Sequence, residues 1–153
     1  MENSTTINIK ALTRLHQIYL IGQLIVAVIA SFLVYSHFSR GSQLEKPLQV
    51  MSVLLSIGGF ILGNWLFKKR LINIRAMQGT ALEKFKVYSE TCILQWNLLQ
   101  GPCLFSLVSF LITGDYAFLC LAGALLLTFV VLAPSKIKVI YDLELSDEEA
   151  ADL

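Results

Sequence analysis

The sequence predicts an all-α fold, a four-transmembrane-helix bundle with up-down-up-down topology. Of its 153 residues, 56% are hydrophobic and only 15% are charged, whereas average soluble domains have about 45–50% and about 25%. Four apolar stretches are close to the roughly 20 residues that a helix needs to cross a hydrocarbon core. Polar and basic segments separate them. We therefore predict a single integral membrane domain over residues 1–153.

The first two spans are expected at residues 12–38 and 47–68. Residues 18–38 contain no Asp, Glu, Lys or Arg, and the helical pattern can begin earlier, near Ile9. Turn residues follow, and Pro47 suits the first turn of a helix because its missing N–H needs no partner there. The second span ends at three consecutive basic residues.

Residues 69–90 have an amphipathic helical pattern with a break near the middle, and we expect them to extend the second and third spans into the cytoplasm as a helical hairpin. The third span is expected at 91–113 and the fourth at 115–133. The link between them is so short that these two helices must be antiparallel neighbours. Gly114 is expected to end the third helix in the left-handed conformation, and Asp115 to cap the fourth.

Residues 134–153 form a predicted cytoplasmic tail. Pro134 marks a break, and residues 135–141 are expected to form a short amphipathic helix that either lies at the membrane interface or extends into the cytoplasm. Ser146 and Glu149 have the spacing of a capping box, which predicts a small acidic helix or a frayed end.

The distribution of charge predicts the orientation. When the loops are assigned alternately to the two sides, ten of the 12 Lys and Arg residues lie on the side of the termini, and only Arg40 and Lys46 lie opposite. Short cytoplasmic loops carry the basic excess, so both termini are predicted to be cytoplasmic in a multi-pass protein of the cell membrane. The basic run at 68–70 is better explained as an anchor next to anionic lipid headgroups than as a nucleic-acid site. The expected partners are therefore the lipid bilayer and other membrane chains, with no nucleic acid.

Small residues recur on one face of two spans, where they let helix backbones approach closely. They are Ser52, Ser56, Gly59 and Gly63 on the second span, and Cys120, Ala124 and Thr128 on the fourth. We interpret both faces as helix-packing surfaces, and a substrate path is the alternative. In the third span, Gly101 and Pro102 predict a kink, because proline cannot donate to the carbonyl of Leu98.

Polar side chains inside apolar spans are the best clues to function, because a bilayer makes them costly. The candidate polar cluster consists of His16, Gln23, Asn64, Glu90, Asn97 and Gln100. Either these side chains line a shallow cavity open to the cytoplasm, or they hydrogen-bond across helices or meet water. If spans one and three are neighbours, His16 and Glu90 are expected to lie within hydrogen-bonding or one-water distance.

The sequence contains no catalytic constellation, such as a Ser-His-Asp set, paired carboxylates in a span or a glycine-rich phosphate motif. Cys92, Cys103 and Cys120 match no zinc or redox spacing. We therefore predict no enzymatic activity, no cofactor and no metal. The first hypothesis is a structural or accessory membrane subunit that packs against itself, as a homo-oligomer, or against a membrane-protein partner. The alternative is a small transporter or channel with a polar cavity between spans one and three.

Four short stretches resemble a known group of proteins: LQGPCLF at 99–105, LITGD at 111–115, PSK at 134–136 and DLELS at 142–146. With these motifs the chain is similar to small bacterial four-span membrane proteins of uncharacterised activity. The resemblance covers most of the chain from the second span onward and implies the four-span architecture. The residue before Gly-Pro is usually acidic in that group and is Gln100 here, which weakens any proton-linked or metal role for this position.

Overall fold

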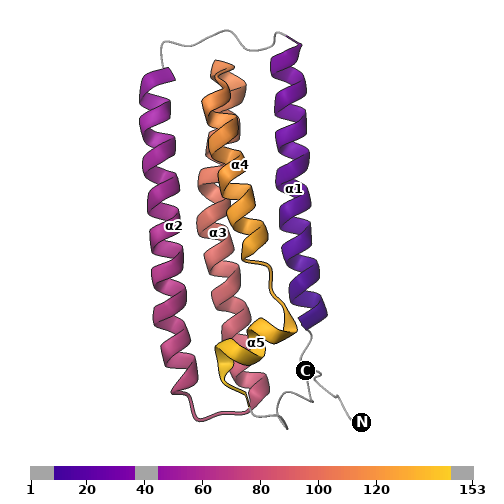
Figure 1. The fold of residues 1–153 in the computed structure, drawn as a ribbon, viewed down its shortest axis with the longest axis vertical. Helices are drawn as coiled ribbons and strands as arrows, with labels where there is room; N and C mark the ends of the chain where they lie inside the picture. The colour runs from indigo at the N-terminus through magenta and orange to yellow at the C-terminus, as the bar shows by residue number, and fades with distance from the viewer. Residues whose placement is uncertain (1–8, 37–44, 146–153) are drawn as a thin grey trace.

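The computed structural model describes residues 9–36 and 45–145. This part of the chain forms five helices and no strand, which confirms the all-α prediction. The helices are α1 (Ile9–Tyr35), α2 (Glu45–Arg75), α3 (Ala81–Thr113), α4 (Tyr116–Val131) and α5 (Lys136–Leu143). Each of α2, α3 and α4 runs antiparallel to the helix before it (Figure 1). The predicted turn at 39–42 and the predicted capping box of Ser146 and Glu149 lie outside the described residues.

Local sequence explains where several helices begin and end. Thr80 and Glu83 form a capping box at the start of α3, in which each side chain accepts a hydrogen bond from the other residue's backbone N–H. Gly114 ends α3 with φ 74°, and its N–H donates to the carbonyl of Phe110 at 2.7 Å. Asp115 caps α4 by accepting a hydrogen bond from the N–H of Ala117 at 3.0 Å. The roles predicted for Gly114 and Asp115 are confirmed.

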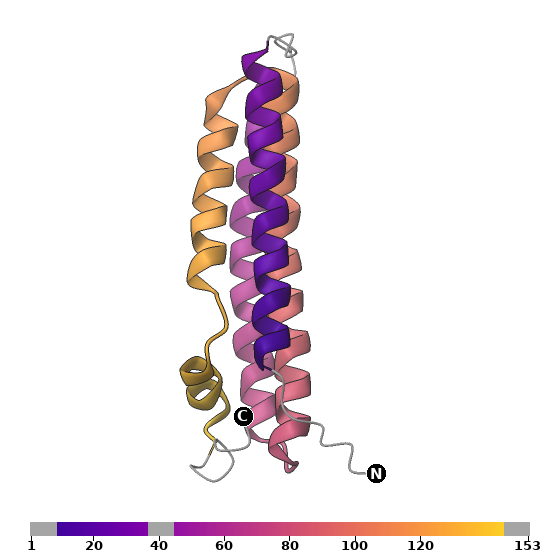
Figure 2. The same cartoon turned by 90° about the vertical axis from the view of Figure 1, so that its right-hand side faces the viewer.

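The long helix α3 lies at the centre of the fold. It packs against α1, α2, α4 and α5, and its most extensive contact is with α2. The two views show α1 and α2 on opposite sides of α3, with α4 across a third side (Figures 1 and 2). Because α3 has neighbours on three sides, it carries many of the fully buried side chains, including Tyr88, Trp96 and Phe110.

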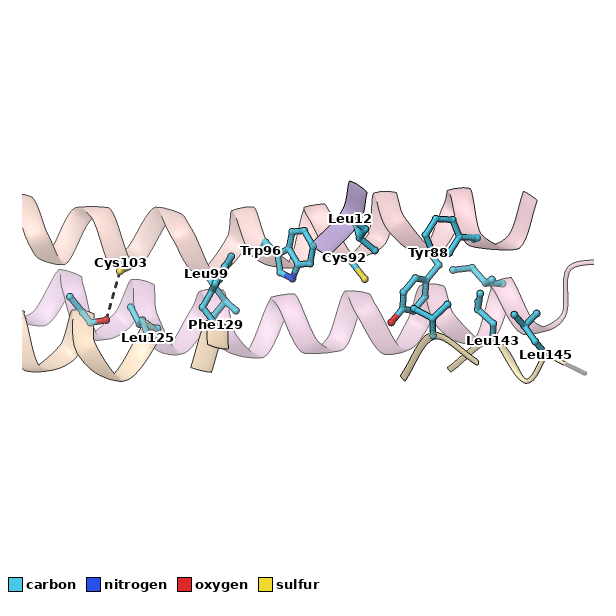
Figure 3. Close-up of a cluster of buried hydrophobic side chains, with 14 of the residues drawn as sticks. Leu12, Tyr88, Cys92, Trp96, Leu99, Cys103, Leu125, Phe129, Leu143 and Leu145 are labelled. Atoms are coloured by element: carbon cyan, nitrogen blue, oxygen red, sulfur yellow. Dashed lines mark hydrogen bonds between the residues drawn. The ribbon is translucent and has the colours of Figure 1, made fainter. Parts of the chain in front are cut away.

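Buried hydrophobic side chains follow α3 along much of its length. Figure 3 shows this row from Cys103 past Trp96 to Tyr88, with Leu125 and Phe129 of α4 against it and Leu143 near its end. The thiol of Cys103 donates a long hydrogen bond of 3.7 Å to the carbonyl of Ala122. The core therefore joins α3 to α4 at one end and to α5 at the other.

Three helices, α1, α2 and α3, are long and apolar enough to cross a membrane. Helix α4 has only 16 residues. It ends at Val131 rather than at the predicted residue 133, since a residue that precedes a proline, here Pro134, disfavours helical geometry. Helices α4 and α5 together qualify as a fourth span, but they are bent by 74° relative to each other.

Candidate functional site: interhelical polar contacts and open grooves along α4

His16 joins α1 to the end of α4. Its side chain is only 3% exposed, and Nε2 donates a hydrogen bond to the carbonyl of Phe129 at 3.0 Å. The imidazole stacks on the ring of Phe129 and meets the edge of Trp96, with ring centroids 4.5 and 4.9 Å apart. Phe129 lies in the last turn of α4, where its carbonyl also accepts a hydrogen bond from the N–H of Leu132 at 3.1 Å, so His16 supplies a second donor to this helix end.

Glu90 lies elsewhere on the surface of α3. Its side chain is exposed. The structure describes both Glu90 and His16, and no hydrogen bond or ion pair joins them. Trp96, which contacts His16, follows Glu90 by six residues on α3. Residues six apart on a helix point in directions about 120° from each other, so Glu90 does not lie on the face of α3 that contacts His16. Of the two arrangements expected for His16 and Glu90, the direct hydrogen bond is therefore not formed, and the approach to one-water distance stays a prediction.

The amide side chains of α3 bond to two different neighbours. Asn97 accepts a hydrogen bond from the hydroxyl of Tyr19 on α1 at 3.1 Å. Gln95 donates to Asn64 on α2, also at 3.1 Å. Because α1 and α2 lie on opposite sides of α3, these two contacts are separate interhelical bonds (Figure 1).

The predicted polar cluster thus does not gather around one cavity. Gln23 is 2% exposed, and its Nε2 atom has no hydrogen-bond partner among the described residues. Gln100 is only partly buried. Two hydrogen-bond partners lie outside the predicted six-residue cluster. Gln95 carries the same signal as Asn97 and Gln100, an amide within an apolar span, and its bond across helices is the kind that this signal predicts. Nothing local distinguishes Tyr19 from an ordinary aromatic residue of an apolar helix.

The small residues of α2 face the rest of the fold, and Gly59 and Gly63 pack against α3. Ser52, Ser56 and Gly63 are buried, and a Cβ atom at Gly59 would collide with the carbonyl oxygen of Leu98. This carbonyl is the one that Pro102 leaves without its helical donor, although α3 continues as one helix past the proline. The predicted kink at Gly101 and Pro102 stays a prediction.

The small residues of α4 behave differently, because they face outward. Cys120 and Ala124 are exposed and line a groove of about 580 Å³ between α4 and α1. Leu20 and Leu24 form the α1 side of this groove. A Cβ atom added at Gly123, which also lines it, would meet nothing within 4 Å. This surface, which we call the α1–α4 groove, is therefore open and uncovered by the described part of the chain.

A smaller groove of about 290 Å³ lies between α2 and α4. It is lined by Gln49, Ser52, Val53, Ala117, Phe118 and Leu121. At one end Gln49 donates a hydrogen bond of 2.6 Å to the carboxylate of Asp115. The hydroxyl of Ser52 is buried and has no partner within the described part of the chain.

Polar contacts also attach α5 to the rest of the fold. The hydroxyl of Tyr88 donates to the carboxylate of Asp142 at 2.8 Å. Arg75 donates from Nε to the backbone carbonyl of Asp142 at 2.8 Å and forms a 2.8 Å ion pair with Glu144. These residues are far apart in the sequence, and no local pattern pairs them.

Comparisons of the chain with known protein families, with curated proteins and with solved structures found no match. Within residues 9–36 and 45–145, no group of three or more His, Cys, Asp and Glu side chains is placed to hold a metal ion.

Proposed function

We propose that the chain is a four-span membrane protein with cytoplasmic termini, which acts as a structural or accessory subunit by packing against itself or against another membrane protein. Three helices are long and apolar enough to span a bilayer, and the shorter α4 supplies the fourth span of this proposal. Large side chains on α1 and α2, such as Phe32 and Leu54, are more than 60% exposed, which suits contact with lipid. The sequence resemblance to small bacterial four-span proteins agrees with this architecture.

The α1–α4 groove carries the proposal. Lipid provides no hydrophobic drive for helices to associate, so partner helices pack where small residues permit close approach. The groove combines such residues, Cys120, Gly123 and Ala124, with the flanking side chains Leu20 and Leu24. On α2 the equivalent small residues Ser52, Ser56 and Gly63 are buried, whereas Cys120 and Ala124 on α4 are exposed. We expect this groove to receive a transmembrane helix of a second copy or of another protein.

Cysteine crosslinking in native membranes tests the proposal. Of the three cysteines, Cys120 is exposed in the groove, while Cys92 and Cys103 are buried. We expect mild oxidation or a short thiol crosslinker to capture a second chain through Cys120, and Cys120→Ser to abolish this product.

A matched pair of glycine variants tests the groove itself. Gly123→Leu fills the groove and should reduce co-purification of the partner at least several-fold. Gly22→Leu places the same side chain in open space on α1, since a Cβ at Gly22 also meets nothing within 4 Å, and it should leave the association unchanged. A protein that is monomeric in membranes, with no crosslinked product and no stoichiometric partner, would contradict the proposal.

A further inference from the structure

Helix α5 lies across the axis of the bundle. Its axis is bent by 74° from that of α4, after a break that contains the buried residue Pro134. Both views show α4 running alongside the other long helices and α5 turning away from that direction (Figures 1 and 2). If the long helices cross a bilayer, α5 therefore lies closer to the membrane plane than to its normal.

The inner face of α5 is fixed to the protein. Val139 and Leu143 are almost completely buried and belong to the same core cluster as Ile74 and Tyr88. The hydrogen bond from Tyr88 to Asp142 holds the same face. These contacts determine the rotation of α5 about its own axis, and so they determine which residues face outward.

The outer face of α5 is apolar and is bordered by basic residues. Ile137 is 81% exposed and Tyr141 is 77% exposed. Residues four apart lie on one side of a helix, so these two side chains form a single patch. Lys136 and Lys138 lie about 100° to either side of Ile137. An apolar stripe between lysines is the pattern of helices that lie in a membrane interface.

The depth of α5 agrees with this pattern. Tyr88, which donates to Asp142, has its ring centroid 5.9 Å from that of Phe67, and Phe67 directly precedes the basic run at 68–70 where the apolar part of α2 ends. Arg75, beyond that run on the polar side, contacts both Asp142 and Glu144. Beside that run the ammonium group of Lys69 lies 5.1 Å from the ring centroid of Trp65. Tryptophan and lysine are residues typical of the boundary between hydrocarbon and headgroups. Helix α5 thus lies beside this boundary, between the levels of Phe67 and Arg75 on α2.

We propose that α5 is an interfacial anchor whose outer face binds an anionic phospholipid surface, with Ile137 and Tyr141 at the acyl boundary and Lys136 and Lys138 at the headgroups. The proposal rests on the membrane insertion put forward above. Of the two positions that the sequence leaves open for this segment, the membrane interface and the cytoplasm, α5 takes the interface, with anionic lipid as its partner. Basic residues near an anionic leaflet are attracted to it, and the attraction weakens with salt.

Spin labelling of the full chain in liposomes tests the depth of α5. Single cysteines replace Ile137 or Tyr141 in a Cys120→Ser background, since the remaining two cysteines are buried. Collisions of the label with oxygen and with a water-soluble paramagnetic complex are compared with those at two reference positions, Ile18→Cys on α1 and Gln78→Cys in the turn between α2 and α3. We expect labels at 137 and 141 to collide with the aqueous reagent several-fold less than the label at 78, but more than the label at 18.

Two outcomes contradict the depth assignment and are distinguishable. If position 18 is shielded but positions 137 and 141 are as accessible to the aqueous reagent as position 78, α5 lies in water and this proposal is wrong while membrane insertion stands. If position 18 is also open to the aqueous reagent, membrane insertion itself is wrong, and both proposals fall.

The lipid charge is tested with the same labels. Shielding at 137 is expected to be at least twofold stronger in vesicles that contain phosphatidylglycerol than in pure phosphatidylcholine. The double variant Lys136→Gln, Lys138→Gln should remove this difference, whereas Lys46→Gln, at the other end of the bundle, should retain it. Equal shielding in the two kinds of vesicle would overturn the anionic preference.

Discussion

Gly59 of α2 lies directly against the backbone carbonyl of Leu98 on α3, the carbonyl that Pro102 deprives of its helical hydrogen bond. A glycine at this point lets the α2 backbone come close enough to contact that oxygen. The ring of Pro102 also borders the site, because a Cβ at Gly59 would be 3.0 Å from Pro102 Cγ. The tight α2–α3 contact therefore depends on a glycine and a proline that are 43 residues apart in the sequence.

Gly59→Ala should destabilise the protein by about 1–3 kcal/mol, because the added methyl group meets backbone that cannot move aside as a flexible side chain would. Its neighbour gives a matched control. Gly58→Ala adds the same methyl group in open space and should be neutral or slightly stabilising. Thermal unfolding in detergent measures both, and equal stability of the two variants would refute the close contact.

His16→Phe should weaken the attachment of α1 to α4 by about 0.5–1.5 kcal/mol. The phenyl ring can keep the stacking on Phe129 but cannot donate to its carbonyl. His16→Ala also removes the ring and leaves a cavity, so it should cost more. The same unfolding assay compares the two, and a His16→Phe variant as stable as the wild type would show that the hydrogen bond contributes nothing.

Tyr88→Phe should loosen α5 without disturbing the long helices. It removes the donor to the carboxylate of Asp142, a type of hydrogen bond worth about 1.5–3 kcal/mol. Hydrogen exchange of residues 136–145 should become faster, while exchange in the middle of α3 should not change. Tyr141→Phe is the control, since that hydroxyl belongs to an exposed side chain. Slow exchange of α5 in both variants would contradict this role for Tyr88.

Double-mutant cycles can separate the two interhelical amide contacts. Asn64→Ala and Gln95→Ala should couple by about 0.6 kcal/mol, the average for such bonds in a membrane protein. Asn64→Ala combined with Asn97→Ala should be additive, because these residues have different partners on different sides of α3. Strong coupling across both pairs would instead favour one shared polar cavity, as the transporter hypothesis requires.

Reporter fusions test the proposed topology. A reporter that is active only outside the cytoplasm should be active after residue 43 and inactive after residue 153, because the basic residues concentrate on the side of the termini. A reporter that functions only in the cytoplasm should give the opposite result at both sites. Activity of the first reporter after residue 153 would disprove the cytoplasmic C-terminus.

Features that depend on neighbouring residues were predictable from the sequence. The apolar stretches determine long helices, since only a helix satisfies the backbone hydrogen bonds of such a segment in lipid. Gly114 and Asp115 determine how α3 ends and α4 begins, because the left-handed conformation and the cap each involve only a few adjacent residues. The same local rule shortens α4 before Pro134.

Which residues meet was decided only by the tertiary structure. The sequence shows small residues on one face of both α2 and α4. Such a face permits a neighbouring helix to approach closely, but it does not indicate whether a neighbouring helix is present. Folding covers Ser52 and Gly63 with other helices and leaves Cys120 and Ala124 open. In the same way, His16 bonds to Phe129, 113 residues away, and not to Glu90, because the rotation of α3 against α1 follows from the packing of whole helix faces. No local spacing in the chain carries that information.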